Sequence, residues 1–382
     1  MRSPMFYKPS IWRRILWVLS ITIAVLAVAA VATYGVRLYL RYAGQVKVNE
    51  NPTVTPLELN LDPGIDYKNI ASDGALYFYS AESLKIMNAS GKLAEDSSLK
   101  MNNPTAVIKG SHALFFDLRG HQAVVYNKAK RVNTITVDSA ILLAAVNDKG
   151  YVILVTEGDL HKAAVRVFNP GSEEIFKWNS GNLSVISADI AESSKDITVS
   201  ALNTDEGTIK NHIIMFNLTK EKPFTNDTYE NVIYSVVRYS GSHLYAISSR
   251  DTVIYNGYGK STGTALYEDR ELIRYLLEDD RLTLIFSGSE TALGSYAEIK
   301  NYNHRGEQTG SFTSQQEFDF IDAEDGIIAL NTGRVISILD SRCQEKRQLN
   351  LNTDLRNLLF FGHKSRAVGI TASGSVLIQT GA

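Results

Sequence analysis

A short pattern returns about every 40 residues in this sequence, and this repeat limits the possible folds more than any other feature. Each copy has an apolar or aromatic pair, then Asn or Asp, then a short polar turn, as in VVYNKAK at residues 124–130. The Asn or Asp positions are Asn88, Asn127, Asn169, Asn217, Asn256, Asn303 and Asp340. Strand-forming repeats of this length are typical of a β-propeller, in which each repeat forms one four-stranded blade.

A second series of features, tight polar turns, lies between the copies of the pattern. The turns cover residues 72–74, 109–112, 147–150, 193–196, 240–243, 278–281, 323–326 and 362–365. We name the strands of a blade a to d in chain order. Because runs of β-formers flank each turn, each turn is predicted to join strands a and b. Eight such turns predict an all-β propeller with eight four-stranded blades, and seven blades is the alternative if one repeat is misread.

The recurring Asn or Asp is then predicted to close strand c, where its side chain caps the c–d turn and its backbone tolerates a positive φ. The last repeat has no strand d, because the chain stops at Ala382 shortly after strand c. Residues 53–61, TVTPLELNL, have strand character and are predicted to complete that blade. Residues 53–382 are therefore expected to form one closed propeller that leaves no exposed sheet edge at the closure.

Residues 15–36 contain no charged side chain, and a helix needs about 20 apolar residues to cross a bilayer. We expect a cytoplasmic tail at residues 1–14, a transmembrane anchor at 15–38 and a stalk at 39–52. Four basic residues precede the apolar run and three follow it, which favours a cytoplasmic N-terminus. The chain would then be a single-pass protein of the cell membrane with an extracytoplasmic propeller. A cleaved signal peptide is the alternative, although signal peptides have shorter apolar regions.

The charge distribution argues against a nucleic-acid partner. Residues 1–49 carry seven basic and no acidic side chains, so a formal net charge of −2 for the chain leaves −9 on the remainder. An acidic body without a basic stripe does not match the phosphate backbone. The single cysteine, Cys343, excludes a disulfide and a Cys-based metal site within one chain.

Motifs of catalysis are missing from the sequence. It contains no metalloprotease, nucleophile-elbow, phosphate-loop or dinucleotide-binding motif. The seven histidines show no metal-ligand spacing, and His112, His243 and His363 fall in predicted a–b turns, where we expect them to be solvated. We therefore expect no enzymatic activity, no metal and no cofactor.

Polar residues precede several predicted strands a, at d–a positions near the mouth of the central channel. These candidate binding residues are Asn103, Asp138, Asn182, Asn231, Asp269, Gln315 and Asp354. They form a candidate ring for a small ligand, and the alternative interpretation is that they are ordinary loop residues.

Long insertions are predicted in three b–c loops, at residues 157–162, 203–211 and 288–296, whereas the other b–c connections are short. Loops placed by a rigid scaffold commonly carry binding. The candidate residues in these outer loops are Asp205, Glu206, Lys210 and Glu290. The path of the closing strand places this elaborated face away from the membrane.

The whole layout resembles a family of uncharacterised, single-pass, membrane-anchored β-propeller proteins of Gram-positive bacteria, grouped as a domain of unknown function. The resemblance rests on the short basic N-terminus, the span ILWVLSITIAVLAVAAVATYGVRLYL and the repeated strand–Asn–turn units. It implies a location at the bacterial cell envelope and supplies no catalytic residues.

Two hypotheses follow. The first is an anchored scaffold that binds an envelope protein or a cell-wall polymer through its outer loops. The second is a small-ligand or glycan sensor, or an enzyme, that uses the channel mouth. A ring of acids or histidines meeting at the propeller axis would favour the second.

Overall fold

The computed structural model describes residues 47–50, 52–57, 61–62, 64–88, 90–220, 222–287, 297–314, 318–361, 366–372 and 374–380. The chain divides into two compact units, Met1–Lys47 and Val48–Ala382. The predicted tail and anchor lie outside the described residues, as does most of the predicted stalk. Within the described ranges, no helix has the length and hydropathy needed to span a membrane.

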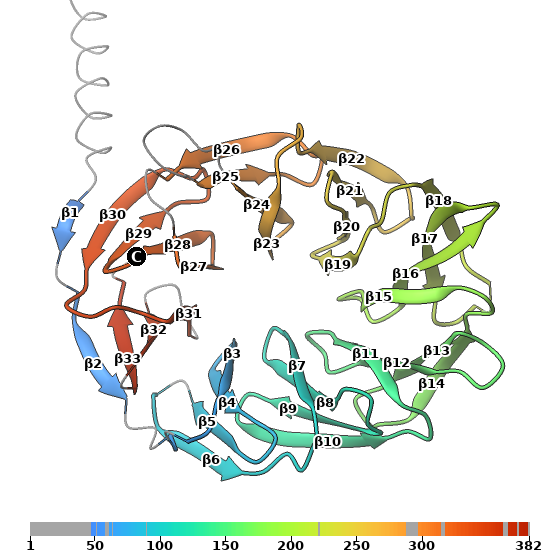
Figure 1. Ribbon diagram of the computed structural model, residues 1–382, viewed down its shortest axis with the longest axis horizontal. Coiled ribbons are helices and arrows are strands. Elements are labelled where there is room, and N and C mark those ends of the chain that lie inside the picture. The colour runs from blue at the N-terminus through green and yellow to red at the C-terminus, as the bar shows by residue number, and fades with distance from the viewer. Residues whose placement is uncertain are drawn as a thin grey trace, which may run out of the picture. The chain divides into compact units, whose positions relative to one another are not determined.

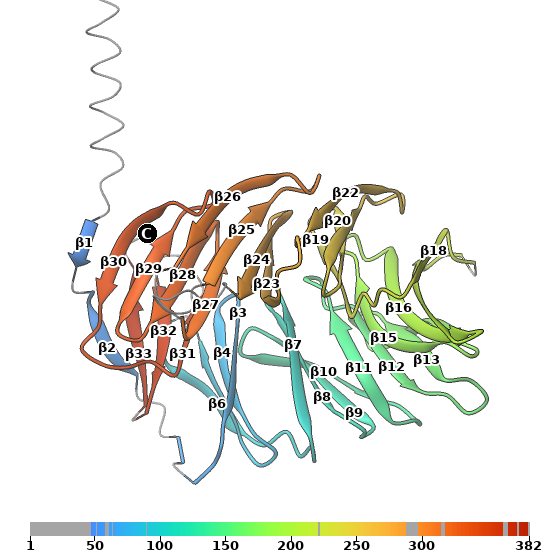
Figure 2. The same cartoon turned by 45° about the horizontal axis from the view of Figure 1, so that its top comes forward.

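The second unit is an eight-bladed β-propeller, so the predicted fold class is confirmed (Figure 1). In every blade, antiparallel strands follow one another from the axis to the rim (Figures 1 and 2). Blade one has β3 (Lys68–Ser72), β4 (Ala75–Tyr79), β5 (Leu84–Asn88) and β6 (Leu93–Ser97). Blade two has β7 (Pro104–Lys109), β8 (His112–Asp117), β9 (Gln122–Asn127) and β10 (Lys130–Thr136). Blade three has β11 (Ile141–Val146), β12 (Val152–Glu157), β13 (Ala163–Phe168) and β14 (Glu174–Asn179). Blade four has β15 (Ser184–Ile190), β16 (Asp196–Asp205), β17 (Thr208–Asn217) and β18 (Thr225–Glu230).

The second half of the ring repeats this order. Blade five has β19 (Val236–Ser240), β20 (His243–Ile247), β21 (Asp251–Tyr255) and β22 (Ser261–Leu266). Blade six has β23 (Leu272–Glu278), β24 (Arg281–Ser287), β25 (Ala297–Tyr302) and β26 (Gln308–Thr313). Blade seven has β27 (Phe320–Glu324), β28 (Ile327–Thr332), β29 (Val335–Leu339) and β30 (Glu345–Asn350). Blade eight has β31 (Asn357–Phe360), β32 (Arg366–Thr371) and β33 (Gly374–Gln379).

The fourth strand of blade eight comes from the start of the propeller. β2 (Val54–Leu57) pairs antiparallel with β33, with Val54 opposite Ile378. This is the closure expected from the sequence, and residues 58–60 of the expected segment lie outside the described residues. A further strand, β1 (Lys47–Glu50), joins the outer edge of blade seven beside β30. Nothing in the repeat pattern predicts this fifth strand.

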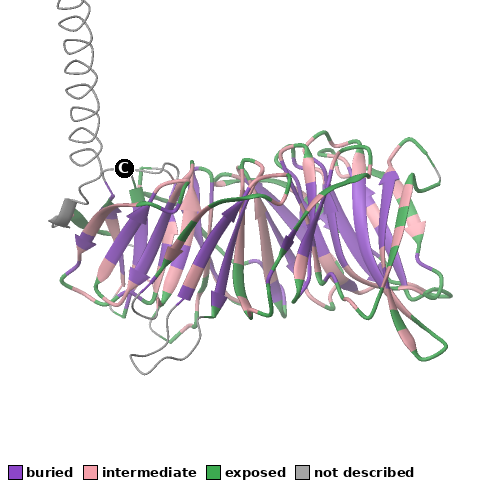
Figure 3. Cartoon of the chain, turned by 90° about the horizontal axis from the view of Figure 1, so that it is seen from above, coloured by how far each residue is buried: buried purple, intermediate pink, exposed green. Residues whose placement is uncertain are grey.

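The core lies between the blades. The described residues contain eight hydrophobic clusters, one at each junction of neighbouring blades. The last of these packs Leu76 of blade one against Val368 of blade eight and so closes the ring. Middle strands such as β8 are buried along their whole length, whereas the outermost strand β18 alternates half-buried and exposed residues (Figure 3). Burying both faces of the middle strands explains their continuous apolar runs.

The recurring Asn or Asp caps the c–d turn, as predicted, in six blades. In blade six, Asn303 Oδ1 accepts hydrogen bonds from the backbone N–H groups of Arg305 (2.9 Å) and Glu307 (3.1 Å). The same bond to the residue two positions later is made by Asn88, Asn169, Asn217, Asn256 and Asp340. Asn127 is the exception, because its amide nitrogen lies 3.1 Å from His112 Nε2 instead. The repeated Asn or Asp does not itself adopt the positive φ that it was expected to tolerate. In blade six the positive φ is found three residues later, at Gly306 (φ 72°).

Candidate functional site

The blade topology gives the propeller two distinct faces. The a–b and c–d turns lie at one edge of the blades, which we call the turn face. The b–c and d–a connections lie at the opposite edge, which we call the loop face. In all eight blades strand a faces the axis and lines the central channel (Figure 1).

Among the described residues, the β16–β17 hairpin has the longest strands that reach the loop face. Its strands have ten residues each, and they pair without interruption from Asp196–Asn217 to Asp205–Thr208. The predicted long loop at 203–211 is therefore wrong, because the two strands continue to a two-residue turn in which Glu206 (φ 49°) and Gly207 (φ 83°) are left-handed.

Three of the four predicted outer-loop residues, Asp205, Glu206 and Lys210, lie at the tip of this hairpin. Lys210 Nζ lies 2.7 Å from Asp205 Oδ2, and this ion pair raises the pKa of Lys210. Glu206 occupies the turn itself and is exposed. Glu290 falls in the third predicted loop, which lies outside the described residues.

The predicted channel-mouth residues lie in separate connections around the ring. The six that are described, Asn103, Asp138, Asn182, Asn231, Asp269 and Asp354, are all exposed in d–a connections. Gln315 lies outside the described residues. Several are held within their own blade: the Asn103 N–H donates to Asp117 Oδ1 (2.7 Å), and Asp354 pairs with Arg334 (2.8 Å). The predicted set is therefore a series of local loop contacts.

Of these residues, Asp138 lines a cavity of about 230 Å³ on the loop face of blade three. The b–c connection contributes Asp159 and His161 to its wall. Arg166, on β13, binds Asp138 (2.6 Å) and Glu174 (2.7 Å) at the same time. The hydrogen bond from Arg166 holds the pKa of Asp138 below its usual value. This polar lining suits a hydroxyl-rich or charged ligand.

A larger cavity of about 410 Å³ occupies the central channel towards the turn face. Strands a of five blades form its wall: β3, β7, β23, β27 and β31. Its acidic lining residues are Asp73, Glu278, Asp322 and Glu324. None of the four is predictable from the sequence as a channel residue, because Glu278, Glu324 and Asp73 lie at hairpin turns, where acidic side chains are usually solvated. The one signal in the sequence was Asp322, which interrupts the otherwise apolar start of its strand.

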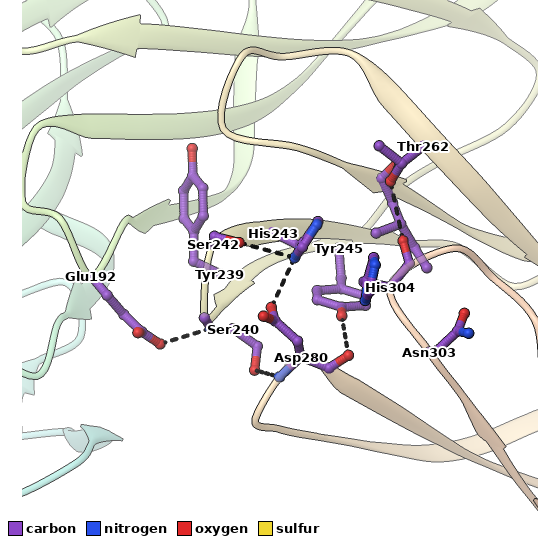
Figure 4. A network of polar contacts seen from close by, with 12 residues as sticks. Glu192, Tyr239, Ser240, Ser242, His243, Tyr245, Thr262, Asp280, Asn303 and His304 are labelled. Atoms are coloured by element: carbon purple, nitrogen blue, oxygen red, sulfur yellow. Dashed lines mark hydrogen bonds and ion pairs between the residues drawn. The ribbon is translucent and has the colours of Figure 1, made fainter. Parts of the chain in front are cut away.

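A cluster of polar side chains on the turn face connects blades five and six (Figure 4). His243 Nδ1 lies 3.0 Å from Asp280 Oδ1, and the rings of His243 and His304 stack with centroids 4.7 Å apart. The Tyr245 hydroxyl donates to the Asp280 backbone oxygen (2.8 Å). The expectation that His243 is merely solvated is therefore wrong, and so is that for the buried His112. His363 lies outside the described residues.

A sequence-family model matches almost the whole propeller. Residues 61–379 match the model of a family described as a family of unknown function, DUF5711. The chain belongs to the DUF5711 family. The matched residues cover nearly the whole propeller, and the predicted anchor at 15–38 lies outside them. No curated protein sequence matches the chain.

Solved structures similar to this DUF5711 protein share its fold. The C-terminal WD40 domain of Sif2 superposes with a TM-score of 0.57 at 10% identity, covering 88% of this chain and 99% of that domain. A chain of the mitotic checkpoint complex reaches a TM-score of 0.47 at 8% identity and covers 87% of this chain and 95% of its own length. At 10% identity, the similarity to the Sif2 domain shows the β-propeller fold alone.

In the channel of the DUF5711 protein, carboxylates connect neighbouring blades. Asp322 Oδ2 accepts a hydrogen bond from the backbone N–H of Phe360 in blade eight (2.7 Å). Glu278 Oε2 accepts one from Gly326 in blade seven (3.0 Å). Across the channel, Asp189 Oδ2 accepts one from Tyr239 (2.7 Å). Strand a has no inner neighbour in its own sheet, so Asp322 and Asp189 supply acceptors for N–H groups of strands a, and Glu278 supplies one for a turn N–H.

Glu324 differs from these acids, because no hydrogen bond to it is found within the described residues. Burial, followed by the charges of the nearby Asp322, Asp325, Glu278 and Asp73, raises the pKa of Glu324 to about 7. Burial also raises the pKa of Asp322 to about 6 and that of Glu278 above its usual value. A carboxyl group that titrates near neutrality in a channel can exchange a proton or accept a bond from a ligand. Within the described ranges, no three His, Cys, Asp or Glu side chains are arranged to hold a metal ion.

Proposed function

We propose that the protein is a membrane-anchored binding scaffold whose loop face holds an envelope protein or a cell-wall polymer. The observation that carries this proposal is the difference between the two faces. On the loop face the β16–β17 hairpin extends beyond the shorter strands of the other blades. The turn face, by contrast, is built mostly from short connections, and the c–d turns of six blades are capped by their own Asn or Asp.

Exposed apolar side chains accompany this hairpin. Ile209 at its tip and Ile233 in the following d–a connection are each 41% exposed, and Leu160 in the b–c connection of blade three is 92% exposed. Apolar side chains rimmed by polar residues are typical of protein-binding surfaces. The anchoring half of the proposal rests on the uncharged residues 15–36.

The register of the β16–β17 hairpin shows how to shorten the hairpin without changing its turn, which tests the scaffold proposal. Asn203 pairs with Lys210, so deleting Thr204, Asp205, Thr208 and Ile209 leaves the Glu206–Gly207 turn on a shorter ladder. The full chain and this variant would be purified from native membranes in mild detergent, and co-purifying molecules would be identified. The scaffold proposal expects a stoichiometric partner that the shortened variant loses. A Lys195→Ser variant in the β15–β16 turn on the opposite face is the control and should keep the partner.

The channel cavity favours a second candidate function, the binding of a small polar or cationic ligand. Its specific support is the convergence of Glu278, Asp322 and Glu324 on one cavity of about 410 Å³. A thermal-shift screen of the full chain against small cations, amino acids and sugars tests it. The candidate expects a ligand whose stabilisation disappears in Glu324→Gln, and a screen without any such ligand contradicts it.

A further inference from the structure

We propose that a basic and aromatic patch on the turn face binds the anionic lipid headgroups of the membrane surface. The patch consists of Lys220, Lys222 and Phe224 in the β17–β18 connection and of Tyr258 and Lys260 in the β21–β22 turn. It rests on the proposed function, because the anchor is what brings the propeller to a bilayer. It adds the face that meets the bilayer and the chemistry of the contact.

The two turns of the patch pack directly against each other. A Cβ atom added to Gly259 would lie 3.1 Å from Phe224 Cε2 and would overlap the side chain of Thr225. The Phe224 N–H donates to the Met215 backbone oxygen (2.9 Å), which fixes the start of β18 beside this glycine. The patch is therefore one continuous surface over blades four and five.

Both aromatic rings of the patch face solvent. Tyr258 is 89% exposed and Phe224 is 40% exposed. Asn256 Oδ1 accepts from the backbone N–H groups of Tyr258 (3.0 Å) and Lys260 (3.1 Å), so the turn that carries the tyrosine is fixed. A rigid turn that holds a large amphipathic ring in water is poorly explained by stability alone. Tyrosine at such a position is favoured at the headgroup level of a bilayer.

The charge of the patch is opposite to that of the body. Lys220, Lys222 and Lys260 are exposed, and none of them has an ion-pair partner within the described residues. Glu221 lies between two of these lysines in the sequence and outside the described residues. Arg305 in the neighbouring β25–β26 turn adds another exposed cation, and Glu307 of that turn is bonded to Asn303 (2.8 Å). The rest of the propeller has a net negative charge, so this positively charged surface is the part that favours an anionic partner.

The path of the chain favours a bilayer as that partner. β2 begins at the turn face, where the Thr53 backbone oxygen accepts a hydrogen bond from Gln379 at the end of strand c (3.1 Å). The uncharged residues 15–36 end 17 residues before Thr53, so the chain that follows the apolar segment enters the closing strand from this side. Anionic lipid attracts lysines that lie beside a membrane, and aromatic rings insert at the same depth.

Two labelling positions distinguish the faces. Gly257→Cys places a thiol beside the patch at a position with an ordinary φ and room for a Cβ, and Leu160→Cys places one on the loop face. The native Cys343 is buried, and burial raises the pKa of its thiol to about 12, so it resists labelling. Each full-length variant would carry an environment-sensitive fluorophore and be reconstituted into nanodiscs of phosphatidylglycerol or of phosphatidylcholine, with a spin-labelled headgroup as quencher.

The patch proposal expects quenching at position 257 that is at least about twofold greater in phosphatidylglycerol than in phosphatidylcholine and that falls with added salt. The triple change Lys220→Glu, Lys222→Glu, Lys260→Glu and, separately, Tyr258→Ser should remove this difference without changing Tm. Position 160 should show no lipid dependence. Equal quenching of position 257 in the two lipids, or stronger quenching at 160, would overturn the proposal.

Incorporation is measured separately, as co-elution of the chain with the discs. A chain that does not enter the discs contradicts the anchor and the patch together. Incorporation without lipid-dependent quenching contradicts the patch alone and leaves the loop-face scaffold standing. A soluble polyanionic polymer could instead bind the patch in discs of both lipids while the quenching stays independent of lipid. That result would show that the polymer, and not the lipid, is the ligand of the patch, and it would also overturn the lipid proposal.

Discussion

The carboxylate of Asp322, on the innermost strand of blade seven, accepts a hydrogen bond of 2.7 Å from the backbone N–H of Phe360 in blade eight. Phe360 lies in the blade that β2 completes when it closes the ring. A single acid therefore satisfies a backbone donor that has no strand partner, in a channel where burial raises the pKa of that acid to about 6.

Replacing Asp322 separates the bond from the charge. Asp322→Ala leaves the Phe360 N–H without its acceptor and should lower the free energy of unfolding by about 1–3 kcal/mol. Asp322→Asn keeps an acceptor oxygen and removes a buried charge that is disfavoured at pH 8, so it should be at least as stable as wild type at that pH. Urea denaturation at pH 8 measures both. Equal losses in the two variants would show that the charge, rather than the hydrogen bond, matters here.

Glu324 predicts an unusual pH dependence. Its folded pKa of about 7 lies above the usual value of 4.5, so the folded state binds the extra proton between these values. Its contribution to stability is therefore favourable below about pH 4.5 and is lost as the pH rises to about 7. Glu324→Gln should be more stable than wild type at pH 8, by about 1–2 kcal/mol after screening, and this difference should be smaller at pH 5.

The difference in Tm between Glu324→Gln and wild type, measured from pH 5 to pH 8, checks this. Comparing the two proteins at each pH cancels the contribution of the other carboxylates. A difference that stays constant across this range would contradict a titration of Glu324.

The turn caps predict a matched pair of variants. Asn303→Ala removes the acceptor of two backbone N–H groups and should cost about 0.5–2 kcal/mol, as other side-chain caps do. Asn127→Ala, at the equivalent repeat position, removes no such cap and should cost less. Thermal unfolding of both variants measures the difference. If Asn127→Ala proves the more damaging, the turn cap is not the reason for the repeated asparagine.

The junction of blades five and six predicts an intolerant glycine. A Cβ on Gly263 would overlap the backbone oxygen of Arg305 in the next blade, so Gly263→Ala should lower the stability by about 1–3 kcal/mol. Gly257 is the control, because its nearest neighbour to an added Cβ is the Ser242 oxygen at 3.8 Å. Gly257→Ala should be close to neutral. Denaturant midpoints of the two variants decide whether backbone contact between blades sets the tolerance.

The sequence by itself determined the features that local hydrogen bonding and alternation specify. The spacing of Asn88 to Asp340 predicted a propeller, and the eight a–b turns predicted eight blades and their strand order. The same Asn and Asp side chains cap most of the turns that they were predicted to end. The strand character of residues 53–61 likewise indicated the segment from which β2 closes blade eight. These features were predictable because each depends on neighbours within a few residues or on a period that the whole chain repeats.

Only the tertiary structure decided which distant side chains meet. Asp73 and Glu324 line one cavity although about 250 residues separate them. Ring closure packs blade one against blade eight, and strands a of blades one, seven and eight then face the same part of the channel. The contact of His243 with Asp280 and that of Phe224 with the Gly259 turn likewise join neighbouring blades. Such contacts depend on the twist and packing angle of whole sheets, which the pattern of a single strand does not encode.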